Sequence, residues 1–202
     1  MNYLGHAYLS FEHPEVLTGN LISDFVKGKK KYDYVPGILA GINMHREIDA
    51  FTDEHSVTKT AKEIFRPAYG LYASAFMDVM YDHFLAVELA ASGADLFLDF
   101  TKRVYASVET FEPVFPDKFR QQFPYMKKHN WLFNYQFDWG IARSLEGLVH
   151  RAVYIQESET AFKLFNRHYG VLKSQYTEFF PQLKQYALEL FLHMPGKYNF
   201  NI

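Results

Sequence analysis

His45 and Asp49 stand four positions apart in the segment GINMHREIDAFTDEH, directly after the apolar run GILAGI. On a helix this spacing places both side chains on one face, from which they can reach the same ion. Ile38, Ile42, His45, Asp49 and Asp53 share an arc of roughly 80°. Because the apolar part of that face must point inward, we expect His45 and Asp49 to do the same. A buried carboxylate then needs a partner charge or a metal ion.

Polar side chains interrupt an apolar helix face in three further places. FMDVMYDHF contains two aspartates four positions apart, on the face of four apolar residues. Such carboxylates repel each other unless a cation lies between them or one is protonated. The three interruptions are the pair Asp78 and Asp82 beside Leu71, Ala75, Leu85 and Leu89; Asp24 beside Leu17 and Leu21; and Asn2 with His6 beside Leu9.

Imidazole and carboxylate groups without thiolates favour Mn²⁺, Mg²⁺ or Fe²⁺ over a structural zinc ion. Metal hydrolases use such sites to activate water and to hold phosphoryl oxygens. Each position also has a structural explanation: His6 as a core histidine bonded to a carbonyl, and Asp53 as a helix cap. The recurrence of the pattern favours the metal site.

Length and composition indicate what kind of protein must position these groups. The chain has 202 residues, 49% hydrophobic and 22% charged, which fits one large domain. A net charge of −2 argues against a nucleic-acid binder. The absence of cysteine excludes thiol catalysis and is compatible with a cytoplasmic protein. The first residues do not form a signal peptide, and no apolar run is long enough for a membrane span.

Helical periodicity covers nearly the whole chain, and strand-like alternation is sustained nowhere. We expect Gly28 to cap the second helix, Pro36 to begin the third and Pro67 to end the fourth, with Asp53 or Ser56 as the cap of that fourth helix. The predicted fold is one all-α domain over residues 1–202. The expected helices cover 2–11, 14–28, 36–53, 57–65, 69–91, 95–111, 117–123, 126–134, 138–154 and 157–193.

Four segments in order, MNYLGHAYLS, GNLISDFVKG, GINMHREIDAFTDEH and MDVMYDHFLA, resemble the acyl carrier protein phosphodiesterase family. The resemblance is close over residues 1–90 and looser from residue 95. It implies an HD-like helical bundle, a divergent branch of the HD-domain phosphohydrolases, with a His/Asp site for Mn²⁺ or Mg²⁺. The implied reaction hydrolyses the phosphodiester between 4′-phosphopantetheine and a serine of acyl carrier protein.

The resemblance carries six metal ligands onto this chain: His6, Asp24, His45, Asp49, Asp78 and Asp82. Arg46 and His83 match the family motifs as well, whereas Gly5 replaces the more frequent alanine. The order Asp82-His83 departs from the usual His-Asp signature, which leaves open which of the two coordinates. We favour Asp82, because it shares a helix face with Asp78.

The reaction also needs a positive charge on the phosphoryl group and a proton for the leaving serine oxygen. Arg46 or a lysine of KGKKK can supply the charge, and His83 or His55 can supply the proton. KGKKK begins three residues after Asp24, so it is expected near the mouth of the site. There it either docks the acidic carrier protein or is an ordinary solvated loop. Its lysines are Lys27, Lys29, Lys30 and Lys31.

Three other functions use the same residues differently. One is an HD-type phosphohydrolase of a nucleotide or another small phosphoester. Another is a helical binding protein whose carboxylates pair with Arg46, Arg143 or Arg151. The third is a non-haem iron oxygenase. The segment NWLFNYQFDW is expected to be core, to wall a pantetheine groove or to stack a base.

Overall fold

The computed structural model describes residues 1–198 and residue 200. Within that part of the chain the regular elements are all helices and no strand occurs, which confirms the all-α prediction. None of these helices combines the length and the hydropathy that crossing a membrane requires. The helices are α1 Tyr3–Tyr8, α2 Pro14–Ile22, η1 Ser23–Phe25, η2 Gly28–Asp33, α3 Pro36–Glu54, α4 Ser56–Lys62, α5 Arg66–Tyr69, η3 Gly70–Tyr72, α6 Ala73–Ser92, α7 Ala94–Glu109, η4 Glu112–Val114, α8 Asp117–Lys128, α9 Trp131–Asn134, α10 Asp138–Arg151, α11 Glu159–Arg167 and α12 Tyr169–Tyr198, of which those marked η are 3₁₀ helices.

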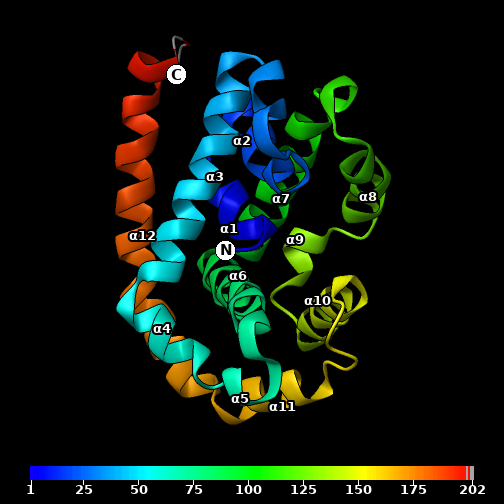
Figure 1. The fold of residues 1–202 in the computed structure, drawn as a ribbon, viewed down its shortest axis with the longest axis vertical. Coiled ribbons are helices and arrows are strands. Elements are labelled where there is room, and N and C mark those ends of the chain that lie inside the picture. Colours follow the sequence, from blue (N-terminus) through cyan, green and yellow to red (C-terminus); the bar gives the residue numbers. More distant parts are fainter. Residues whose placement is uncertain (199, 201–202) are drawn as a thin grey trace.

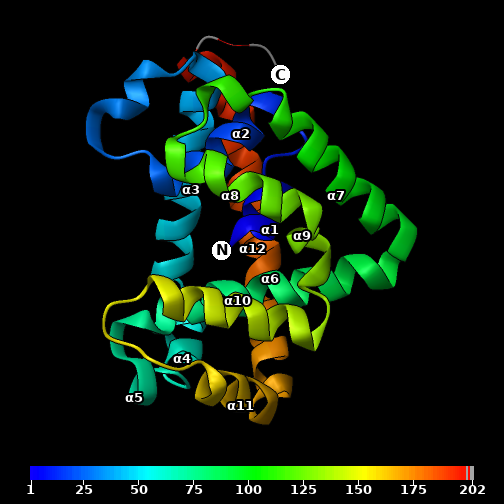
Figure 2. The ribbon, with the colours of Figure 1, turned by 90° about the vertical axis from the view of Figure 1, so that its right-hand side faces the viewer.

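The short helix α1 lies at the centre of the molecule, with longer helices around it (Figure 1, Figure 2). It packs against α2 and α6. Helix α3 packs against α2 and α12, while α10 packs against α6. Buried apolar side chains from Met1 to Met194 belong to one hydrophobic cluster. One domain over residues 1–202 stays a prediction, and this continuous core is consistent with it.

Helices α2 and α3 cross in backbone contact. A Cβ atom on Gly19 would lie 2.0 Å from the carbonyl oxygen of Ile38, and one on Gly41 would lie 2.1 Å from that of Val16. Both distances are far below van der Waals contact, so only glycine fits at the crossing. This close approach fixes where His45, one turn after Gly41, stands relative to α2.

Two helix boundaries, expected at Gly28 and Pro67, lie at other residues. Helix α2 ends at Ile22, so Gly28, with φ of +57°, begins η2 and caps nothing in α2. Helix α4 ends at Lys62, and Pro67 stands in the first turn of α5. Proline is tolerated there because the missing N–H has no partner within the helix. Neither Asp53 nor Ser56 caps α4, whose N-cap residue is His55.

Three further helix boundaries differ from the expectation. Pro124 lies inside α8, which continues to Lys128, and α9 is correspondingly short. The expected helix over 157–193 is divided at His168 into α11 and α12. Leu71, expected on the buried face of α6, lies before that helix and is 95% exposed. Periodicity continued through these breaks, because it registers apolar spacing and not backbone geometry.

Candidate metal centre

His6, His45 and Asp49 meet between α1 and α3. The two imidazole rings are buried and stacked, with centroids 3.8 Å apart and an interplanar angle of 15°. Asp49 Oδ1 lies 3.2 Å from His6 Nε2, and Asp49 Oδ2 lies 3.1 Å from His45 Nε2. One ligand atom from each residue lies within 4.8 Å of the other two. The i, i+4 spacing of His45 and Asp49 therefore does bring both groups to one point, as the helical argument predicts.

A backbone carbonyl orients His45. Its Nδ1 atom lies 2.8 Å from the carbonyl oxygen of Asn20 in α2. In the neutral ring Nδ1–H donates to that oxygen, which leaves the Nε2 lone pair toward the carboxylates. Asp24 Oδ1 lies 3.3 Å from the same Nε2 atom, and its side chain is 70% exposed. Asp24 is therefore the member of this group that solvent reaches most easily.

The ring nitrogens fit a cation. Both nitrogens of His6 and the Nε2 atom of His45 are buried without a hydrogen-bond partner. The carboxylate oxygens approach at 3.1 to 3.3 Å but do not make well-aligned hydrogen bonds. Unpaired buried polar atoms are costly, and a divalent ion between the two rings and Asp49 would satisfy them. This donor set of nitrogen and oxygen suits Mn²⁺, Fe²⁺ or Mg²⁺.

The two histidines have opposite shifts in pKa. Burial and the neighbouring charge of His45 lower the pKa of His6 to about 4. Burial alone would lower the pKa of His45, but its contacts with Asp24 and Asp49 raise it to about 9. The contact with His45 also holds the pKa of Asp24 below its usual value. Without a metal ion, a protonated His45 thus balances the carboxylates, and binding of a cation must displace that proton.

The terminal amine of Met1 lies beside two of the expected ligands. It is 2.9 Å from Asp78 Oδ1 and 3.5 Å from Asp49 Oδ1. Burial alone would lower the pKa of this amine, but the two carboxylates raise it to about 11. Burial raises the pKa of Asp78, whereas the amine and His6 hold that of Asp49 well below its usual range. Asp78 is therefore next to the centre, although it is not one of the three clustered donors.

Asp82 has a different environment. Its Oδ1 atom accepts hydrogen bonds from the backbone N–H groups of Asn2 and Gly5, and its Oδ2 atom accepts one from Leu4. Complete burial raises its pKa to about 7, although these donors act in the opposite direction. The carboxyl group therefore satisfies the first N–H groups of α1, which have no partner within the helix. It is not one of the three clustered donors.

Comparison with known proteins places the chain in a family. A model of a family described as "Acyl carrier protein phosphodiesterase" matches residues 1–183. The chain belongs to this family. It is 35% identical over 188 residues to the acyl carrier protein phosphodiesterase of Klebsiella pneumoniae (strain 342), covering 93% of this chain and 97% of that protein. The proteins of the same name from Enterobacter sp. (strain 638) and Escherichia coli O6:H1 are 33% identical over 184 residues and 31% identical over 188 residues. These matches cover 91% and 93% of this chain and 95% and 97% of the two relatives.

Membership of the acyl carrier protein phosphodiesterase family extends over nearly the whole chain, beyond the first 90 residues where the motifs are clearest. It confirms the predicted family and an enzyme that hydrolyses phosphodiesters. No solved structure matches the chain.

The residues predicted to assist catalysis lie in three different surroundings. Arg46 is exposed, and its Nη2 atom donates to the carbonyl oxygen of Val26 at 3.1 Å. His83 is buried, with Nδ1 2.8 Å from the carbonyl oxygen of Tyr135 and Nε2 3.1 Å from the hydroxyl of Tyr169. Neither His83 nor His55 is among the clustered donors. Of the three, only Arg46 follows directly on a member of that cluster in the chain.

His55 occupies the N-cap position of α4 without a side-chain hydrogen bond there, and it lies against Phe179, with ring centroids 5.0 Å apart. Asp53 is exposed and pairs with Lys62, and it is not one of the three clustered donors. Among the described residues, none of Arg46, Arg143 and Arg151 forms an ion pair with the carboxylates. The alternative of a binding protein with buried arginine pairs thus finds no support.

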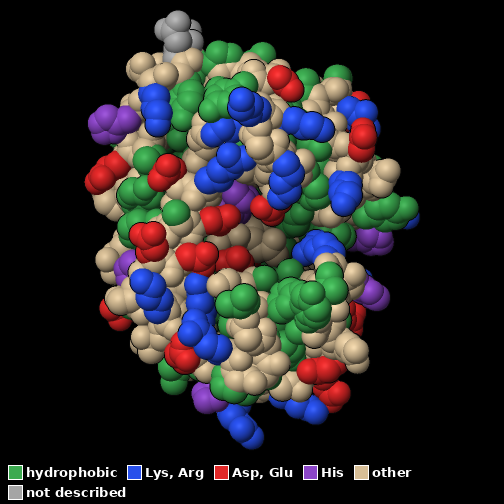
Figure 3. Space-filling view, viewed as in Figure 1, with side chains coloured by type: hydrophobic (Ala, Val, Ile, Leu, Met, Phe, Trp, Pro, Cys, Tyr) green, Lys and Arg blue, Asp and Glu red, His purple; other side chains and the backbone are tan. Residues whose placement is uncertain are grey.

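The lysines of KGKKK differ in their exposure and contacts. Lys27, Lys29 and Lys30 are exposed, whereas the ammonium of Lys31 donates to Asn43 Oδ1 at 2.7 Å. Figure 3 shows Lys and Arg side chains gathered above a hollow whose rim carries acidic groups. This segment follows η1, which carries Asp24, and its place near the mouth of the site stays a prediction.

Sequence reasoning did not find a cavity of about 280 Å³ walled by α1, α9 and α10. NWLFNYQFDW contributes to it: Trp131, Asn134, Tyr135 and Trp139 line the space, while Leu132 is core. The segment therefore combines two of the uses considered for it, core and cavity wall. Its aromatic richness was the signal, but the partner wall comes from residues 2 and 3, far away in sequence.

Proposed function

We propose that this protein hydrolyses the phosphodiester between 4′-phosphopantetheine and a serine of acyl carrier protein. Water attacks phosphorus, the serine oxygen leaves and takes up a proton, and the products are the apo carrier and 4′-phosphopantetheine. The observation that carries the proposal is the buried cluster of His6, His45 and Asp49, with unpaired ring nitrogens, in a chain of this family.

The cofactor we propose is Mn²⁺ or Mg²⁺, with Fe²⁺ as a further candidate. His6, His45 and Asp49 would hold it, with Asp24 and Asp78 at its edge. When bound, such an ion activates water and neutralises phosphoryl oxygens. Asn20 contributes by fixing the ring of His45 through its carbonyl oxygen.

Arg46 is our candidate for the positive charge near the non-bridging oxygens, because it follows His45 on α3 and contacts the segment after Asp24. From the sequence, His83 or His55 is expected to donate the proton to the leaving oxygen. Both have partners elsewhere, so this assignment gains no support from their contacts. Asp24, exposed beside His45, is better placed to exchange protons with solvent.

Mass spectrometry of holo-acyl carrier protein incubated with the purified protein tests the reaction. We expect loss of the phosphopantetheine mass with Mn²⁺ and no loss with EDTA. His45→Ala and Asp49→Ala should abolish the reaction, since each removes a metal donor. Asp53→Asn, one turn further on the same helix, is the matched control and should remain active. No loss of mass by the wild type with any of the three metal ions would refute the proposal.

We further propose that Lys27, Lys29 and Lys30 dock the acidic carrier protein, with Lys31 holding the segment to α3. The double variant Lys29→Glu and Lys30→Glu should raise KM for holo-acyl carrier protein at low salt and spare turnover of a small phosphodiester. Lys59→Glu with Lys173→Glu, exposed on α4 and α12, is the matched control. An unchanged KM in the first variant would contradict docking by this segment.

A further inference from the structure

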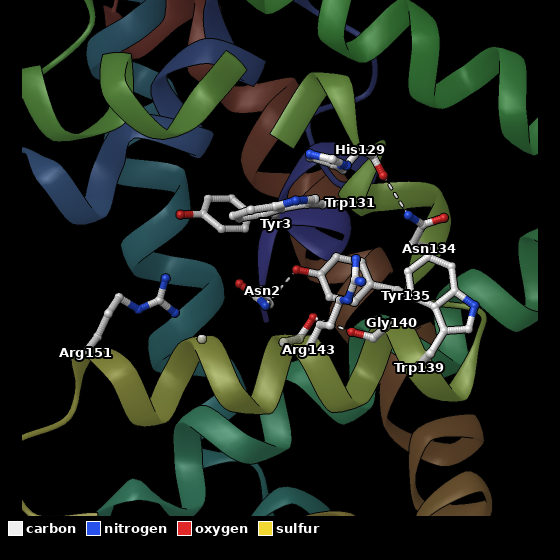
Figure 4. A pocket seen from close by; sticks show the side chains of 12 residues that line it. Asn2, Tyr3, His129, Trp131, Asn134, Tyr135, Trp139, Gly140, Arg143 and Arg151 are labelled. Atoms are coloured by element: carbon white, nitrogen blue, oxygen red, sulfur yellow. Dashed lines mark hydrogen bonds between the residues drawn. The ribbon is translucent and has the colours of Figure 1, made fainter. Parts of the chain in front are cut away.

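The cavity between α1, α9 and α10 has aromatic walls and polar corners. Figure 4 shows Tyr3, Trp131, Tyr135 and Trp139 around it. Asn2 Nδ2 donates to the hydroxyl of Tyr135 at 2.9 Å, and the guanidinium of Arg143 lies over the ring of Trp139, 5.4 Å from its centroid. Such a lining suits a ligand that alternates apolar groups with amides or hydroxyls.

Helix α1 and its N-cap residue contribute to both the cavity and the metal centre. Asn2 and Tyr3 line the cavity, and His6 follows them within one helical turn, a rise of about 4.5 Å from Tyr3. Asp82 holds the start of this helix through three backbone N–H groups. A ligand with its phosphate at His6 and His45 thus has a lined space directly beside it.

At Gly147 the wall of the cavity carries no side chain. Gly147, in the interior of α10, lines the cavity, and a Cβ atom added there would meet nothing within 4 Å. Glycine inside a helix costs roughly 0.5–1 kcal/mol relative to alanine, so it is unfavourable for α10 itself. A side chain at position 147 would therefore extend into the cavity without a clash, in contrast to Gly140, whose Cβ would lie 1.9 Å from the carbonyl oxygen of Asn134.

We propose that this cavity binds the pantetheine arm of the substrate, with its phosphate toward His6 and His45; the inference rests on the proposed function and names the subsite of its substrate. The arm is a thin chain with a dimethyl group, a hydroxyl and two amides. Aromatic faces pack against its apolar carbons, and the guanidinium of Arg143 can donate to an amide carbonyl. The amide nitrogen of Asn134 and the hydroxyl of Ser144 already donate to the carbonyl oxygens of His129 and Gly140, so these two side chains offer their oxygen atoms as acceptors. A volume of about 280 Å³ lies near the lower end of small-molecule sites, which suits a ligand of the size of this arm.

Tryptophan fluorescence gives a direct test, because the chain has two tryptophans and Trp131 and Trp139 both line the cavity. Metal-free protein in EDTA is titrated with 4′-phosphopantetheine, with AMP and with inorganic phosphate. We expect a saturable change with 4′-phosphopantetheine and none at the same concentrations of the other two. An equal response to AMP would assign the cavity to a nucleotide, and an equal response to phosphate would show that the arm is not recognised; either result overturns the inference.

A second experiment fills the cavity with a bulky side chain. Gly147→Phe should weaken the affinity for 4′-phosphopantetheine by about tenfold or more, since its ring occupies the ligand's space. Gly170→Phe is the matched control, because Gly170 is exposed on α12 and a Cβ there also meets nothing within 4 Å. Circular dichroism and urea unfolding establish that both variants fold. Equal affinities of the two variants would overturn the inference.

The same pair of variants separates failure of this subsite from failure of the proposed function. Gly147→Phe should raise KM for holo-acyl carrier protein about tenfold more than KM for bis(4-nitrophenyl) phosphate, which has no arm. Hydrolysis of holo-acyl carrier protein without any fluorescence response would overturn the subsite alone. A specific fluorescence response in a protein that leaves holo-acyl carrier protein intact would refute the proposed reaction and still support a pantetheine site.

Discussion

Replacing Gly19 with alanine should destabilise the protein by about 2 kcal/mol, whereas the same replacement at Gly147 should stabilise it by about 0.5–1 kcal/mol. Both glycines lie inside helices, so alanine improves helix propensity at each by a similar amount. The two positions differ in the space that is available for a Cβ atom. A Cβ at Gly19 would be 2.0 Å from the carbonyl oxygen of Ile38, and one at Gly147 would be free.

The magnitude follows from that distance. Ordinary van der Waals contact of a Cβ atom begins at 3.4 Å, so α2 and α3 must separate by about 1.4 Å at the crossing. Overpacking of this kind costs about 1–3 kcal/mol, and it exceeds the gain in helix propensity. Since Asn20 is the next residue, the shift also lengthens its contact with His45 Nδ1, now 2.8 Å. Loss of such an outer contact weakens metal affinity by about 10- to 100-fold.

Urea unfolding of the metal-free variants measures the first effect, and calorimetric titration with Mn²⁺ measures the second. Gly19→Ala should unfold at lower urea with unchanged slope and bind Mn²⁺ more weakly than the wild type. Gly147→Ala should bind Mn²⁺ as the wild type does. If Gly19→Ala were as stable as Gly147→Ala, the close crossing of α2 and α3 would be wrong. If it were unstable but bound Mn²⁺ normally, the role assigned to the carbonyl of Asn20 would be wrong.

Further predictions concern protons and metal at the centre. Affinity for Mn²⁺ should rise about tenfold per pH unit up to about pH 9, because His45 must lose its proton; calorimetry in two buffers should count about one proton released, and constant affinity would contradict this. Stability of the metal-free protein should fall as the pH rises from about 6.5 to about 9, since the raised pKa of His45 contributes stability only while the ring is protonated, and the fall should be absent in His45→Gln. The lowered pKa of His6 acts in the opposite direction, so stability should also fall as the pH drops from about 6.5 to about 4, less so in His6→Gln. Mn²⁺ at about 100 times its Kd should stabilise the wild type by about 2.7 kcal/mol in thermal unfolding, and Asp49→Asn should show no such increase.

The pairing of His45 with Asp49 was accessible from sequence because both lie on one helix, where geometry is local. Their spacing, together with the apolar residues before them, fixed the face and its inward direction. His6 was found by the same spacing argument but needed the family resemblance to join the other two. Nothing in its own segment indicates that its ring stacks on His45 at 3.8 Å.

Asp82 illustrates why periodicity could not complete the site. It predicts correctly that the side chain is buried, and the residue has no exposed surface. What a buried carboxylate contacts depends on packing between segments, and here the contacts are with residues 77 to 80 positions earlier in the chain. Backbone donors contribute no residue type to a sequence pattern, so the pattern suggested a metal ion, a charged side chain or protonation, and not the backbone of α1.

The carbonyl of Asn20 escaped notice for the same reason, since a backbone acceptor is available at every position. The cavity wall at Gly147 was equally hidden. A glycine in a helical pattern indicates either close packing or open space, and only its neighbours separate Gly19 from Gly147. Helix boundaries at Pro67 and Pro124 were similarly undetermined, because proline is accepted in a first turn and tolerated inside α8.

The position of α1 explains how such a short helix can govern the site. Six residues are too few to form a stable helix in isolation, so its geometry depends on tertiary contacts. Asp82 supplies them at its start, and Asn20 donates to the carbonyl oxygen of His6 at 3.1 Å further along. Between these two anchors α1 presents Tyr3 to the cavity and His6 to Asp49. Because one held element carries both groups, the distance from the proposed arm site to the proposed metal donors is set by the α-helix itself.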